Sequence, residues 1–250
     1  MKKLLVMLLL SQGLLSSPAD LDKADDLLHR GLPAESRKIG EQELAANPSS
    51  LRARIVIAKS ALAQQDLVTA HRFAAEVMQA EPKNADYNAL MGTVLVLEQQ
   101  AAEALPYLEK ALEYGTAEKK SADLMALYSE TLVTGLHQAG QGPLALKRCL
   151  EFIQLYPQDA NLYLAASRLY RERNDYQKAL ESAQKGLQVA PEFYNLYASV
   201  ALAEAGLGHK ELSEKAFLQL QKHEPELAKV VRRVLDGLRK DSAELQLEVK

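Results

Sequence analysis

The chain has 250 residues, of which 48% are hydrophobic and 25% are charged, as is typical of a soluble folded protein. It contains no tryptophan and a single cysteine, Cys149, so no disulfide can form within the chain. The net charge of -3 argues against a general nucleic-acid-binding protein, which would carry a basic stripe, and we expect no nucleic-acid partner.

Residues 1–19 differ from the rest of the chain and are typical of a secretory signal peptide. Lys2 and Lys3 precede a continuous apolar run, Leu4 to Leu10, and Ser17-Pro18-Ala19 supplies the small residues suited to cleavage. The alternative is a transmembrane anchor, which needs about 20 apolar residues, whereas this run is broken after Leu10. The pattern predicts export from a bacterial cytoplasm, cleavage near Ala19, and a periplasmic or secreted chain without stable membrane insertion.

Beyond this segment, prolines recur at a fixed interval. Pro48 and Pro82 are 34 residues apart, and the same interval separates Pro157 from Pro191 and Pro191 from Pro225. Because proline ends helices, the interval predicts repeated helical units. Each unit has an apolar helical stretch, a short polar or glycine turn, and a second helix. Small residues recur in the second helices, where they permit close helix packing, at Ala70, Ala104, Ala145, Ala179 and Ser213.

A 34-residue period of helix–turn–helix units resembles the tetratricopeptide repeat (TPR) family. The segment Asn174 to Leu180 is similar to that family's turn and the start of its second helix, and Gly92 matches the small position of its first helix. The resemblance covers roughly residues 20–225. It implies an all-α, right-handed superhelical solenoid of about six helix–turn–helix units with a C-terminal capping helix.

In chain order, the expected units are a degenerate N-terminal repeat or cap at 20–50, repeats at 51–84, 85–118, 119–159, 160–193 and 194–225, a capping helix at 226–241 and a tail at 242–250. The repeat at 119–159 has seven extra residues near Lys119–Met125, which predict an extended first helix starting near Ala117. This extension either contacts a partner or is a tolerated insertion. Val133 occupies its small-residue position, so we expect the two helices of this unit to splay. The tail frays, extends the helix, or pairs with another chain.

The resemblance also implies that the first helices line a concave groove, which binds an extended peptide or a helix of a partner. The side chains expected to line it are Arg52, Lys59, Asp86, Thr93, Glu130, His137, Asn161, Arg168, Arg171 and Asn195. Arg168 and Arg171 are three apart on one helix and suit a carboxylate or phosphate, the alternative being a solvated helix face. The Lys and Asn pattern of chaperone-binding relatives is not met.

No residue pattern predicts chemistry. The five histidines lie in different units without metal-ligand spacing. Cys149 occupies a helix-packing position, with no base or orienting group indicated nearby. The glycine pairs Gly140/Gly142 and Gly206/Gly208 lack the lysine of a phosphate-binding loop. We therefore predict no catalytic residues, no metal site and no cofactor.

The sequence thus predicts a non-catalytic scaffold or adaptor of the bacterial cell envelope that binds a protein or peptide. One alternative is a pilotin-like factor for type IV pilus and secretin assembly, ranked lower because such factors usually carry a lipid and Cys149 is far from the predicted mature N-terminus. A second is an enzyme or small-ligand binder that uses the groove. Nothing in the sequence indicates a homo-oligomer, a specific partner or a pathway.

Overall fold

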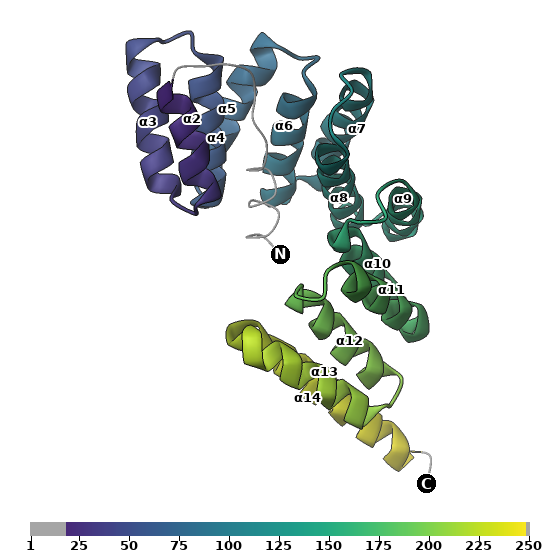
Figure 1. Cartoon of the computed structure of the whole chain (residues 1–250). Helices are drawn as coiled ribbons and strands as arrows, with labels where there is room; N and C mark the ends of the chain where they lie inside the picture. Colours follow the sequence, from purple (N-terminus) through teal and green to yellow (C-terminus); the bar gives the residue numbers. More distant parts are fainter. Residues whose placement is uncertain (1–18, 249–250) are drawn as a thin grey trace. The chain divides into compact units, whose positions relative to one another are not determined.

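The computed structural model describes residues 19–248, with side chains placed for residues 21–238. The predicted signal peptide lies outside the described residues, apart from Ala19. Throughout the described range the regular elements are α-helices (Figure 1): α2 (Ala19–His29), α3 (Pro33–Ala46), α4 (Leu51–Ala63), α5 (Leu67–Ala80), α6 (Ala85–Leu97), α7 (Ala101–Ala117), α8 (Ala122–Gln138), α9 (Gly142–Leu155), α10 (Ala160–Glu172), α11 (Tyr176–Val189), α12 (Tyr194–Gly206), α13 (Lys210–His223) and α14 (Pro225–Glu248).

The turns inside the hairpins share one backbone conformation. Helices pack pairwise, α2 on α3, α4 on α5, α6 on α7, α10 on α11 and α12 on α13. Each of these pairs is joined through a residue with positive φ, and successive turn residues are 34 apart where the period is unbroken: Gly31, Gln65 and Gln99, then Asn174 and Gly208. Because only glycine and, to a lesser degree, asparagine adopt this conformation readily, the two glutamines are held there by the packed hairpins around them.

The prolines end helices as their spacing predicted. Helices α3, α5, α9, α11 and α13 each end two residues before a proline, with last residues Ala46, Ala80, Leu155, Val189 and His223. New helices then begin behind side-chain caps. The Ser50 hydroxyl accepts a hydrogen bond from the Ala53 N–H at 3.2 Å, and the Asn84 side chain accepts one from the Tyr87 N–H at 3.2 Å. Such caps satisfy N–H groups that have no partner inside the helix.

The predicted small positions are where helices approach most closely. All five, Ala70, Ala104, Ala145, Ala179 and Ser213, are at most 1% exposed. At Gly92 on α6, a Cβ atom would lie 2.5 Å from Leu108 Cδ2 on α7, so only glycine fits. Ser213 also donates a 2.8 Å hydrogen bond to the Ala201 carbonyl, which links α13 to α12.

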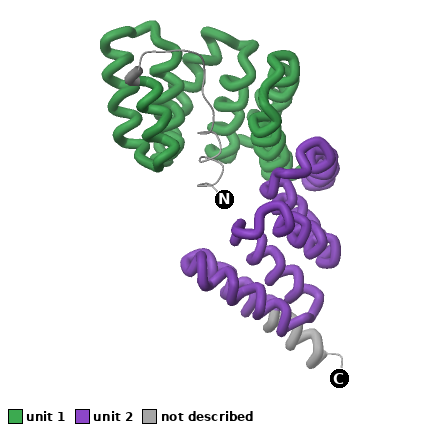
Figure 2. Tube along the Cα trace, in the orientation of Figure 1, with its two compact units in different colours: residues 1–141 green, residues 142–250 purple. Residues whose placement is uncertain are grey.

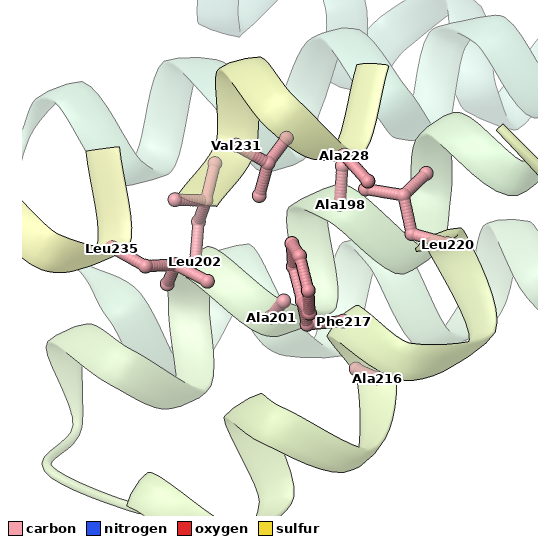
Figure 3. Close-up of a cluster of buried hydrophobic side chains, with 9 residues drawn as sticks. All are labelled: Ala198, Ala201, Leu202, Ala216, Phe217, Leu220, Ala228, Val231 and Leu235. Carbon is pink, nitrogen blue, oxygen red and sulfur yellow. The ribbon is translucent and has the colours of Figure 1, made fainter. Parts of the chain in front are cut away.

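The chain divides into two compact units, residues up to Gln141 and residues from Gly142 (Figure 2). In the first, the hairpin expected to be a degenerate cap packs on α4: Ser60 and Ser36 share a buried 3.2 Å hydrogen bond, and Gly40 approaches Ile57. In the second, α14 covers α12 and α13 through Ala228, Val231 and Leu235, as Figure 3 shows. The backbone of α14 is helical through most of the stretch expected to be a tail.

The seven extra residues lengthen two helices rather than one. Helices α7 and α8 have 17 residues each, against 14 in α5 and 13 in α4, which accounts for three and four additional residues. The start of α8 at Ala122 corrects the predicted start near Ala117. Gly115 and Thr116 replace the proline of other units, so α7 continues, and Ser121 then caps α8. The predicted splaying concerns α8 and α9 of the repeat at 119–159, which lie in different compact units, and it stays a prediction.

Candidate binding surface on the first helices

All ten predicted groove residues lie on the first helix of a repeat. These helices are α4, α6 and α8 in the first compact unit, and α10 and α12 in the second compact unit. Neighbouring first helices contact one another within each unit, α2 with α4, α6 with α8, and α10 with α12. The surface is therefore described separately for the two units. Its charged side chains differ sharply in whether the chain itself already neutralises them.

Arg52, the first predicted cation, is neutralised by α2. Its Nη2 lies 2.6 Å from Asp22 Oδ1 and 2.8 Å from Asp25 Oδ2, and its side chain is 15% exposed. Two carboxylates on one half-buried guanidinium form a strong charge-assisted contact. Arg52 therefore joins the first hairpin to the second and has little capacity left for a partner.

Asp86, at the start of α6, is the centre of a second network. Lys120 Nζ lies 2.6 Å from its Oδ2 and 3.1 Å from Glu118 Oε2, and the Tyr128 hydroxyl donates to its Oδ1. Burial, followed by the negative charge of Asp86, raises the pKa of Tyr128. The Glu118 carboxylate also accepts the Ala85 N–H at 3.0 Å. This network ties the lengthened α7–α8 region to α6, so the extra residues have a structural role.

Lys59 on α4 is half-buried and makes no ion pair with the described residues, in contrast to Arg52. Burial lowers the pKa of Lys59, although the carboxylates of Asp25 and Asp86 act in the opposite direction. Burial is the largest of these influences, and the positive charge of Arg52 also lowers the pKa of Lys59. The predicted pair of cations, Arg52 and Lys59, therefore consists of one neutralised charge and one without an ionic partner among the described residues.

The other predicted groove residues of the first compact unit, Thr93, Glu130 and His137, are buried or half-buried. Thr93 is fully buried and its hydroxyl donates to the Ala89 carbonyl at 2.8 Å. Glu130 is 8% exposed, and His137 near the end of α8 is half-buried. For Thr93, an internal hydrogen bond occupies the polar group that a partner would use, so this residue is placed to shape the surface rather than to bind.

In the second unit, the structure places Arg168 and Arg171 close enough to influence each other. The Arg168 side chain is 17% exposed, and its Nε lies 3.8 Å from Glu172 Oε1, a long ion pair. Burial is the main cause that lowers the pKa of Arg168, and Arg171 adds to it. Asn161, two turns earlier on α10, has a buried side-chain carbonyl without a hydrogen-bond partner in the described chain. Asn195 holds the equivalent, half-buried position on α12.

Sequence reasoning missed the residues that pair with the predicted ones or extend their networks, namely Asp22, Asp25, Glu118, Lys120 and Tyr128. A signal for one pair was present: Asp86 and Lys120 are 34 residues apart, one repeat length, which places them side by side on successive units. The link from Tyr128 to Asp86 spans 42 residues, and no periodicity indicates it.

The described residues form no arrangement that points to metal chemistry: no group of three or more His, Cys, Asp or Glu is placed to hold an ion. A surface depression of ≈ 610 Å³ at the α11–α12 turn is lined by Ala190, Pro191, Glu192 and Phe193 and contains one titratable group. Cys149 is fully buried, and its Sγ lies 3.2 Å from the Leu162 carbonyl oxygen. Within residues 19–248, none of the helices has the length and hydropathy required to cross a bilayer.

The helices pack in pairs, turn residues with positive φ recur every 34 residues, and small residues lie at the helix contacts. These features define a TPR-type, all-α helical-repeat solenoid. Solved structures agree. PilW, described as a widely conserved type IV pilus biogenesis factor, matches with TM-score 0.72 and 17% identity over 83% of this chain and 93% of its own. PilF of Pseudomonas aeruginosa matches with TM-score 0.68 and 16% identity over 90% and 96%.

A third similar structure is YrrB, described as a TPR protein with an unusual peptide-binding site, with TM-score 0.51 and 18% identity over 78% of this chain and 97% of its own. No family model matches the sequence. No curated protein matches it either. At these identities the likeness establishes the fold alone.

Proposed function

We propose that this chain is an exported, non-catalytic adaptor of the bacterial cell envelope, which binds a segment of a partner protein on its first helices. The observation that carries the proposal is the pair Arg168 and Arg171 on α10. Arg168 is 17% exposed, and its Nε lies 3.8 Å from Glu172 Oε1. Two neighbouring guanidinium groups, one of them desolvated, attract a carboxylate, which can accept hydrogen bonds from both.

The test is the double substitution Arg168→Glu and Arg171→Glu in the full chain, followed by cross-linking in the native envelope. Far-ultraviolet circular dichroism checks that the variant is folded, because Arg168 is only 17% exposed, and we expect capture of the partner to fall about tenfold or more. The matched control is Arg173→Glu with Lys185→Glu, which changes the net charge equally at two exposed positions of the same unit. Equal capture by the two double variants would remove Arg168 and Arg171 from the binding surface.

A second candidate function is a pilotin-like role in type IV pilus and secretin assembly. It is supported by the likeness to PilW and PilF, which extends over 83% and 90% of this chain. Against a lipid-anchored mode, Cys149 is fully buried in α9. Deleting the gene and measuring surface pili and secretin multimers tests this role, and a strain that retains both in full would reject it.

A further inference from the structure

Lys59 stands apart from the other charges on the first helices of the first unit. Two nearby carboxylates, Asp25 and Asp86, act on its charge. Asp25 accepts from Arg52 at 2.8 Å and Asp86 accepts from Lys120 at 2.6 Å. Both acids are therefore bound by other cations, and within the described part of the chain the Lys59 ammonium has no ionic partner.

Repeat geometry explains why the chain supplies no partner. Positions 34 apart are equivalent, so the repeat places Asp25 on α2, Lys59 on α4 and Thr93 on α6 at the same position of successive first helices. The Thr93 hydroxyl already donates to the carbonyl four residues earlier. On α4, the positions one turn before and after Lys59 are Ile55 and Ala63, which are apolar. The ammonium thus has apolar positions before and after it on α4 and two occupied carboxylates nearby, and the positive charge of Arg52 also acts on it.

A half-buried ammonium that has lost part of its hydration, and has gained no ion pair, is an unfavourable arrangement in the free protein. An incoming carboxylate would replace the missing hydration with a charge-assisted hydrogen bond. Each neighbouring network holds two carboxylates and one cation, Asp22 and Asp25 with Arg52 and Asp86 and Glu118 with Lys120, so a second acidic group on the same ligand would meet net negative charge. The surroundings of Lys59 therefore favour a ligand that carries a single negative charge within an apolar face.

We propose that Lys59 binds the side-chain carboxylate of one Asp or Glu that lies within an otherwise apolar face of a partner protein segment. This inference rests on the proposed function, because it names the chemistry of a segment bound by the same first helices. It differs from capture of a chain terminus, since the ligand is a side chain inside the segment. It also differs from the site at Arg168, which belongs to the other unit.

The experiment uses two variants of the full chain, each with one photo-activated benzoylphenylalanine probe. The first variant has the probe at Ala63, one turn from Lys59, and the second has it at Leu164 on α10. Cross-linking in the native envelope, followed by mass spectrometry, identifies the captured segment at each position. We expect the segment captured from Ala63 to contain one Asp or Glu among apolar residues. That segment is then synthesised as a peptide, together with a version in which the acid is replaced by its amide.

Binding of the two peptides to wild type, Lys59→Met and Lys59→Arg separates the contributions. On wild type, the amide peptide is expected to bind about tenfold to a hundredfold more weakly than the acid peptide. On Lys59→Met the two peptides are expected to bind equally, and Lys59→Arg is expected to retain the preference for the acid. The exposed Lys83→Met is the matched control and should behave as wild type. Circular dichroism confirms that each variant is folded.

Four results would overturn the inference. The proposed role of Lys59 is rejected, and the proposed function is not, if the segment captured from Ala63 contains no carboxylate. The same holds if Lys59→Met prefers the acid peptide as strongly as wild type does. Capture from Leu164 with none from Ala63 also rejects it and leaves the proposed function standing. Absence of capture at both positions rejects the proposed function and this inference together.

Discussion

Replacing Gly92 by alanine tests the close approach of α6 and α7, on which the stacking of units depends. A Cβ atom at this position would lie 2.5 Å from Leu108 Cδ2 and 2.6 Å from Leu108 Cγ. Ordinary van der Waals contact between carbon atoms needs about 3.5–4 Å, so one of the two must move by about 1 Å. Leu108 has little freedom to do so, because it is fully buried.

Overpacking of this kind costs about 1–3 kcal/mol, while the helix propensity of alanine over glycine returns about 1 kcal/mol. We therefore expect Gly92→Ala to lower the free energy of unfolding by about 0–2 kcal/mol, whereas propensity alone would raise it. The control is Gly237→Ala on α14, where no atom lies within 4 Å of the added Cβ and only the propensity gain of about 1 kcal/mol remains.

Urea unfolding followed by far-ultraviolet circular dichroism measures both variants. A double-mutant cycle with Leu108→Ala adds a sharper check: the leucine variant alone should cost about 2–5 kcal/mol, but the penalty of Gly92→Ala should vanish in its presence. A gain in stability for Gly92→Ala as large as that of Gly237→Ala, or an unchanged effect of Gly92→Ala in the Leu108→Ala background, would refute the claim that α6 and α7 touch at this glycine.

Three further predictions concern turns and charges. Gln65→Gly should raise the free energy of unfolding by about 1 kcal/mol, because Gln65 has φ of 63°, and no gain in urea unfolding would contradict the left-handed turn. Asp86→Asn should lower the free energy of unfolding by about 1–3 kcal/mol, through weaker bonds to Lys120 and Tyr128, and an unchanged thermal midpoint would contradict that network. Burial lowers the pKa of Lys59, so at pH values between this lowered pKa and 10.5 the unfolded chain binds one proton more than the folded chain. Stability of wild type relative to Lys59→Met should therefore rise with pH across that window, and a pH-independent difference in thermal midpoints would show that Lys59 is not desolvated.

The repeat architecture could be predicted because its signals are local and recurrent. Proline blocks a helix wherever it occurs, so Pro48 and Pro82 marked helix ends without knowledge of tertiary contacts. Small residues such as Ala70 and Ala104 mark helix contacts for the same reason, and both are fully buried. The start of α8 was predicted five residues too early because competition between extending α7 and capping α8 at Ser121 depends on packing as well as on sequence.

The state of each charge on the candidate surface could not be predicted in the same way. Arg52 and Lys59 lie two turns apart on α4 and look alike in sequence, yet Arg52 contacts Asp22 and Asp25 and Lys59 contacts no described carboxylate. The difference arises from the reach of each side chain towards α2, and hydrophobic periodicity contains no information about it. Thr93 was predicted to face a partner on register alone, although an internal hydrogen bond occupies its hydroxyl.

The contact between Asp86 and Lys120, one repeat length apart, limits how the chain can exchange modules. Excision of residues 85–118, a full period, would keep every helix in register and would place Arg52, instead of Asp86, one repeat length before Lys120. Lys120 would then face the cation Arg52 in place of the carboxylate of Asp86. Loss or duplication of a unit at this point therefore requires a compensating charge change, so the number of repeats is constrained by electrostatics as well as by the shape of the helices.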